Sequence, residues 1–295
     1  SFVFLSAALG AVVTATAPAA RPAAAEPSSR VSSVKIYRAL NLDACEALAA
    51  SLSEANAQQN GTRWLSAETT PATPLERAVR AVFDLHTSNL EYDAAISGAE
   101  YWVQSHVEAG DAPSNGIALH RDFDLGVLEE DGRGGDVEAA LPNVSTITYL
   151  TSSENSMPTL IFTDFEIATA AGGAWGVAKE AWAVYPRAGK HVCFDGALWH
   201  GVPPAVVYGG PVPARVGVPG ARRVTLLVNV WLDRVPRKAL APRAGAAAFG
   251  AVDVPPLEFA AEGASAVEHW AAQAGPSWQR AGDDDVVAGA LALPL

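Results

Sequence analysis

The sequence is poor in cysteine, in charged residues and in long apolar runs. Its two cysteines, Cys45 and Cys193, are too few and too far apart for a disulfide framework or a cysteine-based metal cluster. Charged residues make up 18% of the 295 residues and hydrophobic residues 49%, so the composition excludes disorder along the whole chain. No uninterrupted apolar run reaches the roughly 18 to 20 residues that a membrane-spanning helix needs.

Basic residues are also scarce. The 20 lysines and arginines stand against 32 aspartates and glutamates, which gives a net charge of −12. Such a chain repels phosphate backbones, and the sequence contains no local basic patch that would override this average. We therefore expect no nucleic-acid partner.

The two ends of the chain differ from its middle. Residues 1–30 run from an apolar stretch into Ala/Pro-rich sequence with small residues in A-x-A spacing, which is typical of a targeting segment for the secretory pathway or an organelle. A buried N-terminal strand is the alternative. Residues 237–295 are rich in Ala, Pro and Gly and include the acidic run Asp283–Asp285, so we expect a packing appendage there. We expect the remaining residues, 31–236, to form the main domain.

Two helices are expected at the start of this domain. Asp43 is placed to cap a helix that runs through Leu48 and Leu52. The segment 73–76, Thr-Pro-Leu-Glu, has the spacing of a capping box with proline at the first helical position. His86 falls at the end of this second helix, where we expect it at the surface.

From Glu100 onward, short runs rich in β-branched and aromatic residues are separated by Gly, Pro and Asp turns. These runs are 101–107, 116–122, 144–150, 159–162, 181–185, 191–194, 197–200 and 224–232. No helix alternates with them, which argues against a parallel sheet built from βαβ units. The pattern favours a mainly β fold, a sandwich or jelly roll with helices on its outside.

The sequence His120-Arg121-Asp122 is a candidate metal-binding motif. On a strand, residues i and i+2 point to the same side, so His120 and Asp122 project together while Arg121 faces away. One imidazole and one carboxylate supply two of the three ligands of a facial triad that leaves iron positions open. A surface polar pair is the alternative for this motif taken alone.

A second histidine follows in the segment 186–201. Its sequence contains P-x-x-G at Pro186–Gly189, F-x-G at Phe194–Gly196 and H-G at His200–Gly201. This order resembles the distal-histidine segment of Fe(II)/2-oxoglutarate-dependent oxygenases. The resemblance implies that His200 is the third metal ligand. His191, one strand earlier, is expected beside the ligands or at the surface.

The family's next element also has a counterpart. In these oxygenases an arginine on the last core strand forms a salt bridge with the far carboxylate of 2-oxoglutarate. Strand alternation over 222–231 places Arg223, Thr225 and Asn229 on one face, and we assign Arg223 to the co-substrate. Arg222 is then expected on the solvent side.

The resemblance spans about Glu100 to Pro236 and is closest to the prolyl-hydroxylase-like branch, in which a tyrosine like Tyr149 contacts the same carboxylate. The segments 100–104 and 231–233 are similar to an alga- and plant-type branch. The implied fold is a double-stranded β-helix, or jelly roll, over about 100–236 with flanking helices. The implied ligands of Fe(II) are His120, Asp122 and His200, and those of 2-oxoglutarate are Arg223, Thr225 and Tyr149.

The resemblance implies a dioxygenase that uses O₂ and 2-oxoglutarate, releases succinate and CO₂, and hydroxylates a peptidyl or small-molecule substrate. An aspartate at position 122 favours hydroxylation over halogenation. The loops 131–144 and 203–221 are expected to determine which substrate binds. Two alternatives stay open: a cupin-like metal enzyme that does not use 2-oxoglutarate, and a non-catalytic jelly-roll binding module.

Overall fold

The structure is a computed structural model of the chain. It describes residues 34–52, 61–107, 117–124, 126–127, 141–152, 158–163, 165–170, 173–202, 222–237, 239–240, 254–261 and 285–294. The predicted targeting segment 1–30, the loop 203–221 and most of the loop 131–144 lie outside these residues.

The described residues form two helices and thirteen strands. The helices are α1 (Leu42–Ser51) and α3 (Pro74–Thr87). The strands are β1 (Lys35–Ala39), β2 (Arg63–Ser66), β3 (Gly98–Val107), β4 (Ile117–His120), β5 (Val144–Tyr149), β6 (Thr159–Phe162), β7 (Glu166–Ala170), β8 (Gly173–Val184), β9 (Lys190–Phe194), β10 (Trp199–Val202), β11 (Arg222–Trp231), β12 (Phe259–Ala261) and β13 (Asp285–Pro294).

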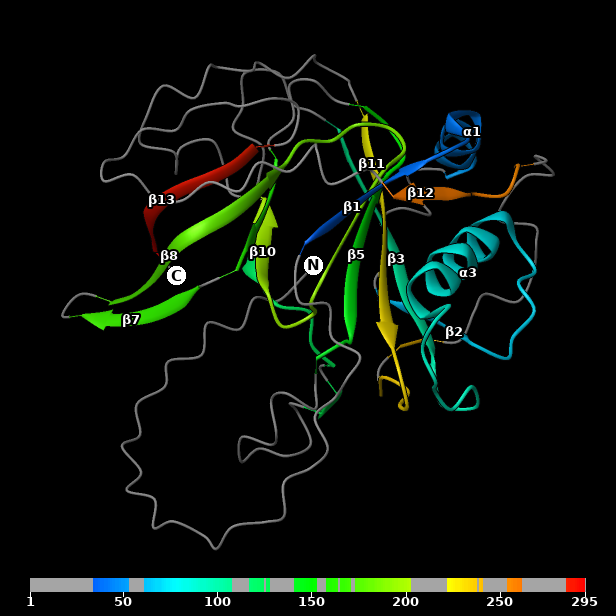
Figure 1. Ribbon diagram of the computed structural model, residues 1–295, viewed down its shortest axis with the longest axis horizontal. Helices are drawn as coiled ribbons and strands as arrows, with labels where there is room; N and C mark the ends of the chain where they lie inside the picture. Colours follow the sequence, from blue (N-terminus) through cyan, green and yellow to red (C-terminus); the bar gives the residue numbers. More distant parts are fainter. Residues whose placement is uncertain are drawn as a thin grey trace, which may run out of the picture.

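The strands pair into two antiparallel sheets (Figure 1). The larger has seven strands in the order β12-β1-β9-β5-β11-β3-β2. The smaller has six, in which β13-β8-β6-β10-β4 form the main path and β7 pairs with β8. The predicted mainly β fold with flanking helices is confirmed at this level. No described helix is long and apolar enough to cross a membrane.

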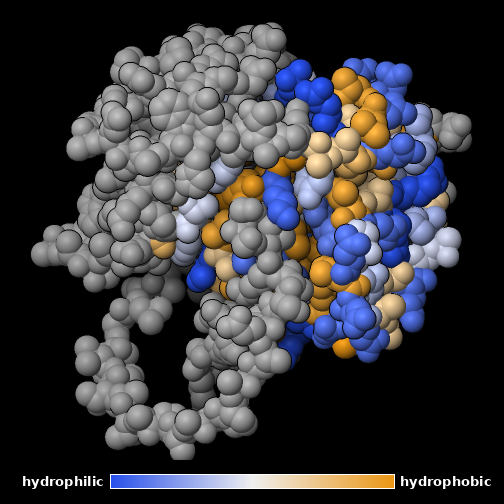
Figure 2. All heavy atoms as spheres, in the orientation of Figure 1, coloured by the Kyte–Doolittle hydropathy of each residue, from blue (hydrophilic) through white to orange (hydrophobic). Residues whose placement is uncertain are grey.

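The two sheets face each other across an apolar core. This inner core is built from alternate residues of β5, β9 and β11 in the larger sheet and of β6 and β8 in the smaller one. Its fully or nearly buried members include Ile147, Val192, Phe194, Leu227, Ile161 and Val184. In Figure 2, apolar side chains also reach the surface over the strip where β10, β5 and β11 lie in Figure 1.

The helices cover the other face of the larger sheet. In Figure 1, α1 and α3 lie on the side of β11 and β3 that is opposite to β8 and β10. Their apolar residues, such as Leu48, Val79 and Phe83, form a second core with Val224 and Leu226 of β11. The central strands β5 and β9 of the larger sheet are therefore buried on both faces, and every residue of each strand is buried.

The helix ends agree with the sequence at α3 and differ at α1. At α3 the Thr73 hydroxyl accepts the Glu76 amide at 3.1 Å, and the Glu76 carboxylate accepts the Thr73 amide at 3.1 Å, so the capping box is confirmed. At α1 the cap is Asn41, whose side chain accepts the Ala44 amide at 3.3 Å. The prediction of Asp43 as the cap was wrong, because Asp43 lies in the first turn, where the helix dipole favours an acid.

Candidate metal centre

Two of the three predicted metal ligands lie on neighbouring strands of the smaller sheet, and Asp122 lies two residues after the end of β4, because the strand predicted over 116–122 ends at His120. His120 is the last residue of β4, and it stands directly opposite His200 of β10 in the strand register. Residues opposite each other in an antiparallel pair point to the same side of the sheet. His200 is 3% exposed, which places its ring in the interior between the two sheets.

Asp122 completes a compact group of three donors. Its carboxylate oxygens lie 3.8 Å from His120 Nε2 and 3.7 Å from His200 Nε2. One ligand atom from each of the three residues lies within 4.8 Å of the others, a spacing compatible with a single ion. Two imidazole nitrogens and one carboxylate form a donor set that suits Fe(II). Metal binding by this group stays a prediction.

The ring of His200 is oriented for binding through Nε2. Its Nδ1 donates to the Leu198 carbonyl oxygen at 3.1 Å, so the lone pair is on Nε2, which faces Asp122. Phe194 packs edge-on against the ring, with centroids 4.9 Å apart. Burial lowers the pKa of His200, a nearby His120 lowers it further and Asp122 acts in the opposite direction, and the neutral form is the one a metal needs.

Ser145 is a site residue that the sequence analysis missed. It lies on β5 of the larger sheet, is 1% exposed, and donates from Oγ to Asp122 Oδ2 at 2.9 Å. This bond crosses from one sheet to the other and fixes how the carboxylate is turned. The sequence did contain a signal for Ser145. Side chains alternate between the two faces of a strand, so Ser145 shares the inner face with Ile147 and Tyr149.

Arg223 also lies on the inner face, where it is 7% exposed. Its Nη2 donates to Thr159 Oγ1 at 3.0 Å, and its guanidinium lies 5.4 Å from the centre of the Tyr149 ring. The Tyr149 hydroxyl contacts the same Thr159 Oγ1 at 2.8 Å, and Thr225 stands opposite Tyr149 in the register. The three predicted co-substrate residues are therefore neighbours, while their role stays a prediction.

Arg222 points to the other side of β11. Its Nε donates to Ser105 Oγ at 2.6 Å and its Nη2 to the Leu52 carbonyl oxygen at 2.9 Å, just after the end of α1. The expectation of a solvent-side charge was wrong, because the helical layer covers this face. Arg222 connects α1 to the sheet.

The buried His191 and the partly buried His86 form a pair on the face of the larger sheet that is opposite to the candidate ligands. Their Nε2 atoms are 2.8 Å apart, and the Thr148 hydroxyl lies 2.7 Å from His191 Nδ1. The pair lies between α3 and the outer face of the larger sheet. The expectation for His191 was wrong, because it is fully buried on that face, whereas His86 lies in the last turn of α3 as predicted and is partly exposed. Burial lowers the pKa of His86 to about 4 and that of His191 well below its usual value, which keeps both rings neutral.

A polar row crosses the inner face of the larger sheet beside Asp122. Ser145, Asn229 and Glu100 stand opposite one another on β5, β11 and β3. Glu100 accepts hydrogen bonds from the Thr62 hydroxyl and from Trp231 Nε1, and burial raises its pKa to about 7. Asn229 Oδ1 is buried without a hydrogen-bond partner.

Comparisons with known proteins give structural similarities alone. No protein-family model matches the chain, and no curated protein matches it. A prolyl-4-hydroxylase from Pseudomonas putida is 19% identical over 68% of this chain and 84% of its own, with a TM-score of 0.38. An oxidoreductase of the 2OG-Fe(II) oxygenase family from Burkholderia pseudomallei is 14% identical over 54% of this chain and 56% of its own, with a TM-score of 0.27. Values this low carry no inference about activity.

Proposed function

We propose that this protein is an Fe(II)- and 2-oxoglutarate-dependent dioxygenase that hydroxylates a peptidyl or small-molecule substrate. The observation that supports the proposal is that one interior, between two facing sheets, contains both a two-histidine, one-carboxylate group and a buried arginine. In this proposal the two sheets are the halves of a double-stranded β-helix.

Fe(II) would be bound by His120, Asp122 and His200. Bound iron would supply activation of O₂, with one oxygen atom entering the substrate and the other entering succinate as 2-oxoglutarate loses CO₂. The chain supports this by orienting its ligands: Ser145 Oγ donates to Asp122, and the Leu198 carbonyl accepts from His200. Such supporting bonds fix ligand geometry before the metal arrives.

The far carboxylate of 2-oxoglutarate would pair with Arg223. A guanidinium binds a carboxylate through two parallel hydrogen bonds, and a buried arginine makes these bonds stronger than water-exposed ones. In a chain with net charge −12, a dianion needs such a local cation. Thr159 and Tyr149, which contact Arg223, keep the guanidinium in place.

The primary test is an anaerobic visible spectrum of the protein with Fe(II), before and after addition of 2-oxoglutarate. A weak charge-transfer band that needs both additions, and that is absent from the His200→Ala variant, is the expected result. Iron binding without the band would favour the cupin-like enzyme. No iron binding would favour the non-catalytic jelly-roll module.

A matched pair of arginine variants tests the co-substrate assignment. Arg223→Gln should raise the 2-oxoglutarate concentration needed for the band by about 10- to 100-fold while iron affinity is unchanged, since a charge-assisted bidentate pair is lost. Arg222→Gln removes the same charge from the adjacent position and should leave the 2-oxoglutarate requirement unchanged. Equal effects of the two variants would contradict the assignment. Succinate release then becomes the assay for substrates.

A further inference from the structure

Arg121 lies between two candidate metal ligands in sequence, directly after the end of β4, and its side chain lies beside Trp199. His120 and Asp122 face the interior, whereas Arg121 lines a pocket on the outer face of the smaller sheet with Trp199 of β10 and Phe162 of β6. This face has its own buried cluster, separate from the core between the sheets.

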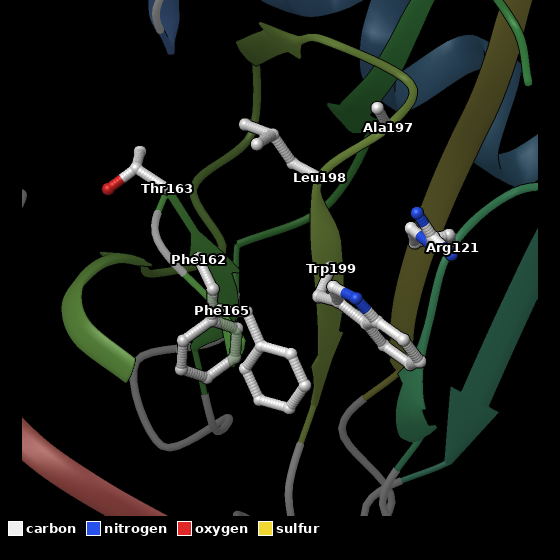
Figure 3. A pocket seen from close by; sticks show the side chains of 7 residues that line it. All are labelled: Arg121, Phe162, Thr163, Phe165, Ala197, Leu198 and Trp199. Atoms are coloured by element: carbon white, nitrogen blue, oxygen red, sulfur yellow. The ribbon is translucent and has the colours of Figure 1, made fainter. Parts of the chain in front are cut away.

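The pocket has aromatic walls (Figure 3). Its volume is about 270 Å³, and it is lined by Arg121, Phe162, Thr163, Phe165, Ala197, Leu198 and Trp199. Three rings follow one another along it, with centroids 5.4 Å apart between Phe162 and Phe165 and 5.0 Å apart between Phe165 and Trp199. Phe162 is buried, whereas Phe165 and Trp199 are partly exposed, so these two rings are the ones that a further flat group can contact.

The guanidinium of Arg121 lies between two rings. It is 5.0 Å from the centre of the Phe123 ring and 5.2 Å from that of Trp199. Its Nε is buried without a hydrogen-bond partner, and within the described ranges no ion pair involves it.

We propose that this pocket binds a single-ring aromatic carboxylate. The volume lies just below the range of about 300–1,000 Å³ typical of drug-sized ligands, so it suits one ring and not a larger cofactor. The aromatic walls suit the ring, and the two Nη atoms of Arg121 form the fork that a carboxylate accepts. The site does not rest on the proposed oxygenase activity, because Phe162, Phe165 and Trp199 belong to the cluster on the outer face and not to the core between the sheets.

The test is a ligand-observed NMR titration of metal-free protein with benzoate, and with benzyl alcohol as the uncharged analogue. Metal-free protein is used so that benzoate has no ion to bind at the candidate triad. Benzoate should bind with a Kd on the order of 1 mM, because so small a ligand makes few contacts. Benzyl alcohol should bind at least about 10-fold more weakly, since it lacks the charge-assisted pair.

Three variants assign the binding. Arg121→Gln should weaken benzoate binding at least about 10-fold. Arg121→Lys keeps the charge without the fork, so its affinity for benzoate should lie between those of the wild type and of Arg121→Gln. Arg38→Gln removes an exposed arginine from the other sheet and should have no effect. Equal affinity for benzoate and benzyl alcohol, or an unchanged affinity in Arg121→Gln, would overturn the proposal.

Two more variants locate the bound benzoate and show whether the chain itself fills the pocket. If Arg223→Gln abolishes benzoate binding while Arg121→Gln does not, the ligand occupies the inner face and the proposal is wrong. Asp164 precedes Phe165 in sequence and lies outside the described residues. If benzoate binds only to the Asp164→Asn variant, a carboxylate of the chain itself occupies the position, which also overturns the proposal.

Discussion

At the scale of single residues, the candidate metal centre depends on hydrogen bonds that orient its ligands. Asp122 and His200 each have one supporting bond, from Ser145 Oγ at 2.9 Å and to the Leu198 carbonyl at 3.1 Å. The H-x-D and H-G motifs predicted the three residues that the structure brings together, because these motifs are short and local. Ser145 was missed because its partner, Asp122, is 23 residues away in sequence.

Ser145→Ala should therefore weaken metal binding without unfolding the protein. Loss of a bond that supports a ligand typically lowers metal affinity by about 10- to 100-fold. The measurement is a competition titration of Fe(II) against a chelator of known affinity. Thr146→Ala is the control, since the Thr146 hydroxyl donates to the Val228 carbonyl and its loss should reduce stability alone. Equal metal affinities for the two variants would contradict the role given to Ser145.

Asn229 gives a second residue-scale prediction, about stability. Its Oδ1 is buried without a partner, so Asn229→Leu, which has a similar volume, should stabilise the fold by about 1 kcal/mol through removal of a desolvation cost. The measurement is urea unfolding. Asn143→Leu is the contrast, because Asn143 Oδ1 accepts the Leu232 amide at 2.8 Å and its loss should destabilise. A stability loss of similar size in both variants would show that Oδ1 of Asn229 is hydrogen-bonded.

At the scale of elements, local signals predicted well and long-range ones did not. The capping box of α3 lies within four residues, and the predicted strands of the two sheet centres are rich in β-branched residues. By contrast, β1 and β2 are short edge-side strands, and β13 contains five residues of Ala, Gly or Pro. Their pairing is decided by distant partners, as with β1 and β12, which no local pattern reveals. The His86–His191 contact spans 105 residues for the same reason.

Two variants at the start of α1 distinguish the observed cap, Asn41, from the predicted one, Asp43. Asn41→Ala should destabilise the protein by about 1 kcal/mol, because the Ala44 amide loses its acceptor. Asp43→Ala should cost about 0.3–1 kcal/mol at most, since Asp43 interacts only with the helix dipole. Urea unfolding of both variants at low salt checks the order. A larger loss in Asp43→Ala would restore Asp43 as the cap.

At the scale of the whole molecule, the larger sheet separates two chemically different layers. Its inner face meets the smaller sheet and has the candidate metal ligands, Arg223 and Glu100 nearby. Its outer face meets α1 and α3 and has the His86–His191 pair. Each layer therefore contains ionisable groups whose pKa values depend on the fold, and Glu100 on the inner side responds to pH in the opposite direction to His86 on the outer side.

Burial, together with a smaller effect of the nearby Lys35, lowers the pKa of His86 to about 4. A histidine whose folded pKa is below its unfolded value contributes stability above about pH 6.5, and loses it as the pH falls toward the folded pKa. Tyr37 and Cys193, which also lie beside the pair, stay neutral over this range because burial raises the pKa of both. Protonation of the His86–His191 pair therefore lowers the free energy of unfolding below about pH 6.5.

Glu100 acts in the opposite direction. Burial raises its pKa to about 7, so its contribution is present at low pH and is lost as the pH rises from about 4.5 to about 7. Between about pH 4.5 and 7, the stability of the wild-type protein therefore depends on pH through two opposing contributions. Two variants separate these contributions. His86→Gln should make stability decrease more steeply with rising pH, and Glu100→Gln should make it decrease more steeply with falling pH. Urea unfolding from pH 4.5 to 7.5 measures both slopes. Parallel profiles for the two variants would contradict the assignment of opposing pH dependences to His86 and Glu100.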